Sequence, residues 1–394
     1  MVVFAHYPAS ETRVHREAEA LLNRGYEVDI ICLREFGMRP EAAFEIVDRA
    51  RVYRLPVSRF YGGVGYFRQF VEYMAFFLLV MLTLTWLHLR RRYATIQVHN
   101  LPDFLVFAAW FPKLLGATLI LDLHDLMPEF FAARSGRSIK SWLVRLVIWQ
   151  ELLSCRFADQ VITVTQLWRQ TLIRRGLPQS KVSVVMNVPD DLVFRRNGRP
   201  TSRGDSTFRL FYHGALAKHN GVDLILGAVA RLQNECPNLH LCIHSGVTGH
   251  QKDELVALAN RLGITDRVDF SGELLAVSEL PKLIGTADVG LVPYRNDVFA
   301  DGILPTKLME YVALGLPVIA ARTSAIATYF DDTMVQFFQP GDVEDLTRSI
   351  RNLYHDRERL RELARNAEHF NRQHNWTTEG ASYVALLGCL SGRV

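Results

Sequence analysis

A lysine and a glutamate three positions apart, Lys307 and Glu310, stand at the expected start of a helix. Pro305 suits that start, where a missing N–H costs little, and Gly315 suits the left-handed cap after the helix. Residues three apart share one helix face. Backbone N–H groups and the Lys307 ammonium can then hold phosphates, while Glu310 can bind ribose hydroxyls. The alternative is a surface ion pair on an ordinary strand–helix crossover.

Polar residues also follow two expected strands in the first half of the chain. Residues 94–103 read as a strand that runs into a polar loop, and residues 118–129 read as another. In open α/β sheets, ligands bind at the carboxyl ends of strands. One histidine at such an end is usually structural, but two polar strand ends favour a site. The spacing of the histidines does not indicate zinc. The residues concerned are His99, Asn100, His124, Asp125 and Glu129.

The elements that must position these residues alternate between strand and helix. The strand of residues 2–5, the helix of residues 17–25 and the strand of residues 26–33 read as a βαβ unit that opens a doubly wound sheet. The first loop lacks the Gly-x-Gly-x-x-Gly pattern of nicotinamide dinucleotide sites. Arg13 and Arg16 precede the helix, where they either bind an acceptor phosphate or remain solvated surface charges.

Length and composition indicate a folded protein of two domains. A chain of 394 residues is long for one core, and the polar stretch of residues 194–206 is the clearest boundary. The net charge of +4 fits anionic substrates or an anionic membrane surface, and no nucleic-acid-binding motif appears. Five scattered cysteines and a start too quickly polar for a signal peptide predict a cytoplasmic protein with reduced thiols.

Residues 66–92 form an unusually apolar segment that ends in Arg90, Arg91 and Arg92. Its apolar core is marginal for a spanning helix, which needs about 20 apolar residues. A spanning helix would also separate two halves of one sheet across a membrane. The aromatic residues and the basic end instead favour peripheral contact with an anionic leaflet. A fully buried core helix is the alternative.

Residues 305–320, Pro-Thr-Lys-Leu-Met-Glu-Tyr-Val-Ala-Leu-Gly-Leu-Pro-Val-Ile-Ala, resemble the donor-site signature of the retaining glycosyltransferases of family four. The second glutamate of that signature is Glu310, whereas the first falls at Gly302. Asp301, next to Gly302, is the candidate substitute for the first glutamate. The resemblance implies the GT-B fold, with two Rossmann-like doubly wound domains facing each other across a cleft. The expected acceptor domain is 1–195, with a helix at about 377–390 packing back on it, and the expected donor domain is 207–376.

The resemblance also implies roles for particular residues. The two strand-end loops resemble the family's acceptor-domain loops, so His99, Asn100, Asp125 and Glu129 are expected on the acceptor side. His124 matches the family histidine that lies against the transferred sugar. Lys218 and Lys307 are expected to neutralise the donor diphosphate, although the family's own arginine and lysine positions hold Ala215 and Asn220. The loop at Gly272 resembles the one that meets the nucleotide base. The other expected donor-binding residues are Gly214, Gly246, Pro305, Thr306 and Asp301.

The implied reaction is transfer of a hexosyl unit from a UDP- or GDP-linked sugar to an acceptor hydroxyl, with retention. The aromatic residues and basic end of residues 66–92 predict a lipid-linked or glycan acceptor. Such a reaction belongs to surface polysaccharide or glycolipid synthesis, at the inner face of the cell membrane. No cofactor, divalent cation or nucleic acid is expected. Two alternatives remain open. One is a nucleotide-sugar epimerase of the same architecture, and the other is a degenerate, non-catalytic scaffold of a glycan-assembly complex.

Overall fold

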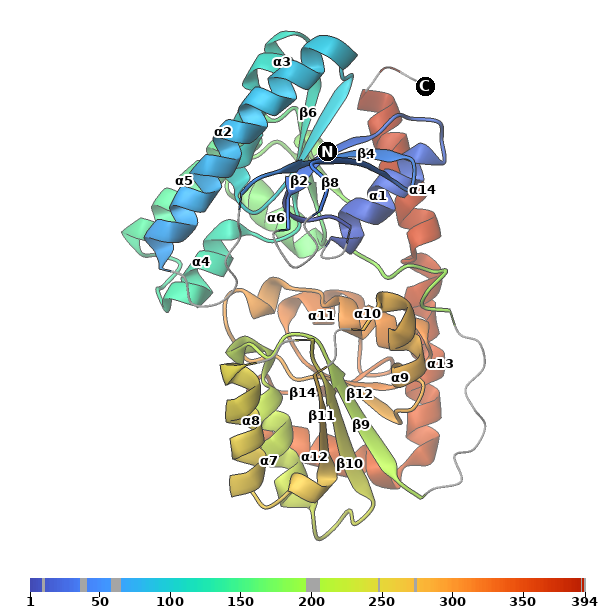
Figure 1. The fold of residues 1–394 in the computed structure, drawn as a ribbon. Coiled ribbons are helices and arrows are strands. Elements are labelled where there is room, and N and C mark those ends of the chain that lie inside the picture. Colours follow the sequence, from blue (N-terminus) through green and yellow to red (C-terminus); the bar gives the residue numbers. More distant parts are fainter. Residues whose placement is uncertain are drawn as a thin grey trace. The chain divides into compact units, whose positions relative to one another are not determined.

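The computed structural model describes residues 1–8, 11–35, 41–57, 65–195, 206–246, 249–272, 275–390 and 392. They form two compact units: unit 1 is Met1–Asn187 with Thr377–Val394, and unit 2 is Val188–Trp376. Each unit is a largely parallel sheet with helices packed on it (Figure 1). The predicted α/β class with two Rossmann-like domains is therefore confirmed. The predicted boundary stretch, 194–206, lies mostly outside the described residues.

Unit 1 contains an eight-stranded sheet with the order β3-β4-β2-β1-β5-β6-β7-β8. Only the pair β3–β4 is antiparallel among the described strands. After β4 the chain continues on the other side of β1 with β5, so the topological switch point lies between β1 and β5. The strands are β1 (Val2–His6), β2 (Asp29–Leu33), β3 (Phe44–Val47), β4 (Ala50–Leu55), β5 (Thr95–His99), β6 (Thr118–Leu123), β7 (Gln160–Thr163) and β8 (Val182–Val184).

The first helix of unit 1 begins earlier than the sequence predicts. Helix α1 covers Thr12–Leu22, because Val14, Ala18 and Leu21 form a buried stripe that includes its polar first turn. The other helical segments of unit 1 are α2 (Tyr66–Arg91), η1 (Asp103–Ala109), α3 (Trp110–Leu114), α4 (Met127–Ser135), α5 (Trp142–Phe157), α6 (Gln166–Arg174), η2 (Gln179–Lys181) and α14 (Trp376–Leu390).

The C-terminal helix α14 packs on unit 1 beside α1 (Figure 1). Tyr383 and Leu387 of α14 join a core cluster that contains Val14 of α1 and Ile30 of β2. The Tyr383 hydroxyl donates a hydrogen bond to Oε1 of Gln97, with a distance of 2.6 Å. This buried bond connects the end of the chain to the middle of the sheet.

Unit 2 contains a six-stranded parallel sheet with the order β11-β10-β9-β12-β13-β14, so its switch point lies between β9 and β12. The strands are β9 (Phe208–His213), β10 (Leu239–His244), β11 (Val268–Ser271), β12 (Val289–Val292), β13 (Val318–Ala321) and β14 (Gln336–Phe338). The helical segments are η3 (Lys218–Asn220), α7 (Val222–Leu232), α8 (His250–Arg261), η4 (Thr265–Arg267), η5 (Val277–Glu279), α9 (Leu280–Ile284), η6 (Ala300–Gly302), α10 (Thr306–Ala313), α11 (Ser324–Tyr329), α12 (Val343–His355) and α13 (Arg357–Gln373).

The apolar segment of residues 66–92 forms one helix, α2, along the side of unit 1. Phe76, Val80 and Leu84 are buried on its inner face, and Phe76 packs edge-on against Phe4 of β1 with ring centroids 5.1 Å apart. The opposite face is open to solvent, since Leu82 is 64% exposed. The alternative of a fully buried core helix is therefore wrong.

Candidate active site

The polar residues after β5 and β6 meet beside the switch point of unit 1. Asn100 joins the two strand ends, because its Oδ1 accepts hydrogen bonds from the backbone N–H groups of His124 (3.1 Å) and Asp125 (3.4 Å). Its Nδ2 donates to Oδ1 of Asp103 at 3.0 Å and to the backbone carbonyl of Asp125. Both the oxygen and the nitrogen of the Asn100 amide thus make their hydrogen bonds within these loops. Asn100 therefore holds the two strand ends together.

His124 projects from this strand end as a half-buried side chain. Burial lowers the pKa of His124 to about 4, and the nearby Asp122 carboxylate only partly opposes that effect. The imidazole is therefore neutral near pH 7. Its Nδ1 has no hydrogen-bond partner among the described residues. A neutral imidazole with a free ring nitrogen can orient a sugar hydroxyl without adding charge to the site.

A buried ionic network lies beneath His124. The guanidinium of Arg13 donates to both carboxylate oxygens of Asp122, at 3.0 and 3.3 Å, and lies 3.1 Å from Oε1 of Glu17. Nδ1 of His99 lies 3.2 Å from Oδ2 of Asp122. Burial raises the pKa of Asp122, but Arg13 and then His99 outweigh burial and hold that pKa well below its usual range.

This network corrects two expectations from the sequence. Arg13 is only 4% exposed, so it is neither a solvated surface charge nor a free ligand for an acceptor phosphate. His99 is fully buried and supports the network from below. Ligand atoms of His99, Asp122 and His124 lie close enough for a metal ion, but the Arg13 guanidinium already neutralises the carboxylate that such an ion would need.

Arg16 and Glu129 also have structural partners. Nη2 of Arg16 donates to Oδ1 of Asn187 at 2.7 Å. This hydrogen bond connects α1 to the last residue before the chain enters unit 2. Glu129 forms an ion pair with Arg175, and Arg175 also donates to Oε2 of Glu151 at 2.6 Å. Asp125 remains half-buried beside His124. Burial raises the pKa of Asp125 to about 7, with Glu11 and Asp103 adding to the effect.

In unit 2, two of the predicted donor residues, Lys307 and Gly214, meet at the switch point between β9 and β12. Lys307 is in the first turn of α10 and is only 8% exposed. Its ammonium donates to the Tyr212 hydroxyl at 3.0 Å and would lie 3.3 Å from a Cβ added to Gly214. Gly214, with φ at 116°, therefore leaves room for Lys307 beside the end of β9. Burial lowers the pKa of Lys307 to about 7, although Glu310 partly opposes this shift.

Glu310 lies one turn further along α10 and faces a residue that the sequence interpretation did not include. Nε2 of His213, the last residue of β9, is 3.0 Å from Oε2 of Glu310. The backbone N–H of His213 donates to the Tyr311 hydroxyl at 3.2 Å. His213 could have been found by the same strand-end rule that identified His99 and His124. It positions the carboxylate that is expected to bind the ribose.

The remaining predicted donor residues lie in different environments. Lys218 is exposed in η3 and forms no ion pair with another described residue, whereas Gly246 is exposed after β10. Gly272 follows β11, and the Lys252 ammonium lies 2.6 Å from the position of an added Cβ. Lys252 of α8 therefore lies beside the loop after β11.

The start of α10 agrees with the expected helix boundary. Pro305 is the N-cap residue of α10, and Thr306 is its first residue. Asp301, expected as a substitute for the absent first glutamate, has a structural partner instead. Its Oδ1 accepts a hydrogen bond from the backbone N–H of Ser324 at 2.8 Å, at the start of α11.

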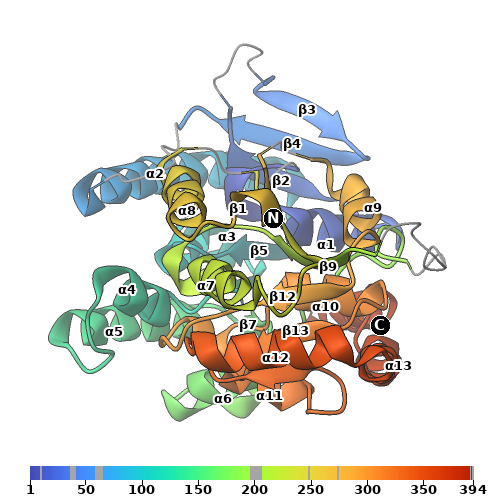
Figure 2. The ribbon, with the colours of Figure 1, turned by 90° about the horizontal axis from the view of Figure 1, so that it is seen from below.

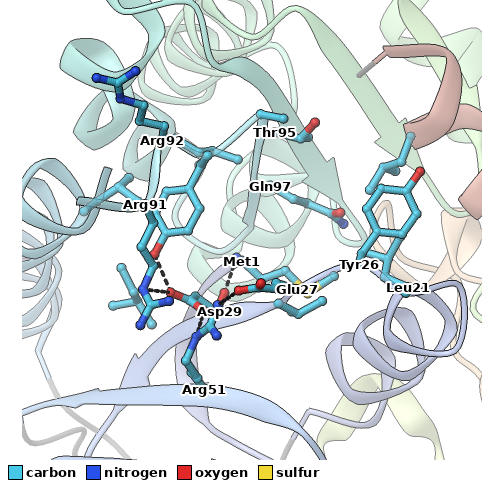
Figure 3. Close-up of a pocket in the computed structure, with 18 residues that line it drawn as sticks. Met1, Leu21, Tyr26, Glu27, Asp29, Arg51, Arg91, Arg92, Thr95 and Gln97 are labelled. Carbon is cyan, nitrogen blue, oxygen red and sulfur yellow. Dashed lines mark hydrogen bonds and ion pairs between the residues drawn. The ribbon is translucent and has the colours of Figure 1, made fainter. Parts of the chain in front are cut away.

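A cavity of about 370 Å³ opens at the opposite, amino-terminal edge of the unit 1 sheet (Figure 3). Asp29 lies at its centre, where its carboxylate accepts hydrogen bonds from Arg51 and from Tyr93, each at 2.6 Å, and pairs with Arg91 at 3.1 Å. None of the predicted site residues lines this cavity. Its polar groups bind one another, so the strand-end clusters remain the candidate active site.

The two Rossmann-like units, each with polar residues at its switch point, have the GT-B fold. Two family models match the chain: the glycosyl transferase 4-like domain over residues 9–187 and the glycosyl transferases group 1 domain over residues 196–370. The chain belongs to the family-four glycosyltransferases of group 1.

Relatives of known name support this assignment. The sulfoquinovosyl transferase SQD2 of Arabidopsis thaliana is 24% identical over 288 residues, which cover 70% of this chain and 52% of that protein. The D-inositol 3-phosphate glycosyltransferase 2 of Catenulispora acidiphila is 28% identical over 285 residues, or 68% of this chain and 64% of that protein. The chain thus spans less than two thirds of these relatives.

Solved structures share the fold at low sequence identity. The sucrose-phosphate synthase of Thermosynechococcus elongatus has a TM-score of 0.80 and 17% identity, with 100% of this chain and 99% of that chain covered. Anabaena HepE in complex with UDP-glucose has a TM-score of 0.71 and 17% identity, with 98% and 99% covered. These likenesses extend the fold assignment to nearly the whole chain.

Proposed function

We propose that this protein transfers a hexosyl unit from a nucleotide-activated sugar to a hydroxyl group of a lipid-linked or glycan acceptor, with retention. The observation that carries the proposal is the arrangement of Lys307 and Glu310 on α10. The buried ammonium faces Gly214, and the carboxylate faces His213, at the switch point of unit 2. A cation for phosphates and a carboxylate for ribose hydroxyls are thus within one helical turn.

We assign the donor nucleotide to unit 2. Lys307 and the backbone N–H groups at the start of α10 bind the diphosphate, and Glu310 accepts hydrogen bonds from the ribose. Lys218 adds a second positive charge from the loop after β9. UDP is the first nucleotide to test, because Anabaena HepE, which shares the fold, has been solved with UDP and with UDP-glucose.

In this mechanism the protein positions groups and stabilises charge. Charge develops on the leaving diphosphate as the glycosidic bond breaks, and the Lys307 ammonium stabilises that charge. The diphosphate in turn accepts the proton of the acceptor hydroxyl, so no protein nucleophile is needed. His124 orients the transferred sugar as a neutral hydrogen-bonding group. Loss of one such contact is expected to cost about 2–4 kcal/mol in the transition state.

The proposed setting is the cytoplasmic face of the cell membrane, in the synthesis of surface polysaccharide or glycolipid. The exposed apolar face of α2 supports peripheral contact there, because Leu78 and Leu82 are 50% and 64% exposed. A lipid-linked acceptor is held at such a surface, which explains why a transferase for it needs an apolar helix.

Calorimetric titration of UDP and GDP into the wild type and Glu310→Ala tests the proposal. We expect the wild type to bind one of them and the variant to bind it at least about tenfold more weakly. Glu368→Ala is the matched control, since Glu368 pairs with Arg372 on the surface of α13. Product analysis with the donor alone then separates a transferase, which releases the nucleotide, from an epimerase, which returns an altered sugar nucleotide.

One observation favours the non-catalytic scaffold as a second candidate. The first signature glutamate is absent. The carboxylate of Asp301, beside that position, already accepts a hydrogen bond from the backbone N–H of Ser324. If neither UDP, GDP nor another nucleoside diphosphate binds at millimolar concentration, the catalytic proposal fails and the scaffold takes its place.

A further inference from the structure

Helix α2 of unit 1 has an apolar outer face as well as an apolar inner face. The inner residues Phe76, Val80 and Leu84 pack on the unit, whereas a surface helix normally carries polar residues on its opposite side. Here the opposite side holds large apolar side chains at helical spacing, each 47–81% exposed. This outer stripe consists of Phe67, Val71, Leu78, Leu82, Trp86 and Leu89.

Two further helices of unit 1 expose the same kind of side chain. Trp142, Leu146 and Trp149 form a stripe along α5 and are 72%, 54% and 57% exposed. Helix α3 exposes Trp110, Leu114 and the adjoining Leu115. Four of the six tryptophans of the chain are therefore open to solvent on these three segments. We call the exposed apolar residues of α2, α3 and α5 the tryptophan surface.

The three helices lie on one side of unit 1. Both α2 and α5 pack against η1, since Phe104 of η1 lies 6.1 Å from Phe77, and Phe107 of η1 lies 5.0 Å from Phe157, between ring centroids. Helix α3 continues directly from η1 and contacts α2. Figures 1 and 2 show α2 and α5 on the same side of the unit in two views at right angles.

The charges on these helices are segregated by sign. The acidic residues of α2 and α5 are Glu72 and Glu151, whose side chains are no more than 12% exposed. Helix α3 has no acidic residue, and its Lys113 pairs with Asp159, which follows α5. The exposed charges of these three described helices are all positive, although Arg91 also pairs with Asp29. They are Arg68, Arg90, Arg91, Arg145 and Arg156. Arg90 also lies 4.0 Å over the ring of Trp86.

We propose that the tryptophan surface docks on an anionic phospholipid bilayer, with α2, α3 and α5 in contact with the membrane together. Tryptophans and leucines enter the interface between headgroups and chains, and the arginines bind anionic headgroups. This inference extends the peripheral contact in the proposed function from one helix to a surface of three. Helix α2 is long and apolar enough to cross a membrane, but its inner face is packed against β1, so it lies along the bilayer.

Co-sedimentation with vesicles tests this surface in the full-length protein. The vesicles contain either phosphatidylcholine with phosphatidylglycerol or phosphatidylcholine alone. One variant combines Leu146→Glu with Trp149→Glu in α5, and another combines Leu78→Glu with Leu82→Glu in α2. Ile46→Glu is the matched control, because Ile46 is 64% exposed on β3, outside the tryptophan surface.

We expect the wild type and the Ile46 variant to bind the anionic vesicles equally. Each double variant should bind at least about tenfold more weakly, and binding of all proteins should weaken at high salt. The α5 variant decides whether the docking surface includes helices other than α2. If it binds like the wild type, or if the wild type binds both kinds of vesicle equally or neither, the inference is overturned.

Two controls distinguish membrane docking from misfolding of a variant and from dimerisation. Far-UV circular dichroism and thermal unfolding of each variant check that unit 1 is folded, and nucleotide titration tests the proposed reaction independently of the membrane. If the protein binds vesicles but no nucleotide, the proposed docking surface is supported and the proposed reaction is contradicted. Light scattering measures the mass in solution, and a dimer that the double variants dissociate would show that a second copy covers the surface instead.

Discussion

The side-chain oxygen of Asn100 accepts a hydrogen bond from the backbone N–H of His124, at 3.1 Å. Asn100 follows β5 and His124 follows β6, so this contact connects the ends of two neighbouring strands. Asn100 was expected on the acceptor side, and His124 was expected against the transferred sugar. The geometry instead gives Asn100 the task of positioning the loop that carries His124.

Replacement of Asn100 by alanine should reduce turnover while nucleotide affinity stays unchanged. The variant loses hydrogen bonds to the backbone of His124 and Asp125, each with a net contribution of about 0.5–1.5 kcal/mol. We expect kcat to fall roughly 10- to 100-fold in a transfer assay. A fall in calorimetric nucleotide affinity of similar size would contradict this role, because the proposed donor residues belong to unit 2.

Affinity for the donor nucleotide should decrease as the pH rises above about 7. Burial places the pKa of Lys307 at about 7 without ligand, and a bound diphosphate favours the charged ammonium and raises that pKa. The wild type must therefore take up a proton on binding at higher pH, which weakens binding by up to about tenfold for each pH unit. Titrations in buffers of different ionisation enthalpy measure this uptake. In Lys307→Met binding should be weaker and independent of pH above 7, and a sloping profile in that variant would assign the proton to another group.

Loss of the His213 side chain should weaken nucleotide binding through Glu310. The two polar side chains lie 3.0 Å apart in a mostly buried site, and loss of the partner of a buried polar group costs about 1–3 kcal/mol. We therefore expect His213→Ala to bind nucleotide roughly 10- to 100-fold more weakly. His240→Ala is the control, because Nε2 of His240 lies 2.8 Å from Asp269 in an exposed pair of the same sheet. Equal effects of both substitutions would point to a general loss of stability.

Gly290 is expected to tolerate no side chain, because an added Cβ would lie 2.5 Å from the ring of Tyr311. Tyr311 accepts the backbone N–H of His213, so a shift of the ring also moves the donor cluster. Gly290→Ala should lower the free energy of unfolding by about 1–3 kcal/mol and weaken nucleotide binding. Urea unfolding measures the first effect, and Gly65→Ala, which meets no atom within 4 Å, is the control.

The buried acidic cluster beside α5 should make unit 1 less stable as the pH rises. Burial raises the pKa of Glu151 to about 8, against the effect of Arg175, and burial raises the pKa of Asp103 to about 7. Both pKa values exceed those of the same groups in the unfolded chain. The stabilisation of the folded state that comes from these two protonated carboxyl groups is therefore complete below about pH 4, and it is lost as the pH rises through 7–8. Glu151→Gln removes one titrating group and keeps a partner for Arg175.

We therefore expect the Tm of the wild type, relative to that of Glu151→Gln, to fall between pH 5 and pH 8. A relative fall of at least about 2 °C corresponds to roughly 1 kcal/mol in a domain of this size. A constant difference across this range would mean that Glu151 is ionised in the folded protein throughout.

Local patterns in the chain were enough to predict the fold class, the strand ends that carry His99 and His124, and the helix that carries Lys307 and Glu310. These features depend on neighbouring residues, because hydrophobic periodicity, caps and turn residues act over a few positions. The apolar character of residues 66–92 was equally visible from composition. The start of α1 could not be predicted in this way, because its polar first turn is buried by contacts with segments that are distant in the sequence.

Tertiary structure decided which groups became partners and which remained available. Arg13 is buried because Asp122, 109 positions away, lies beside it in the folded unit, and Glu310 faces His213 because α10 packs at the end of β9. Periodicity shows which residues share a face, but the face that meets a neighbour depends on packing. For the same reason only the folded unit shows that α2 and α5 leave tryptophans and leucines uncovered on one side.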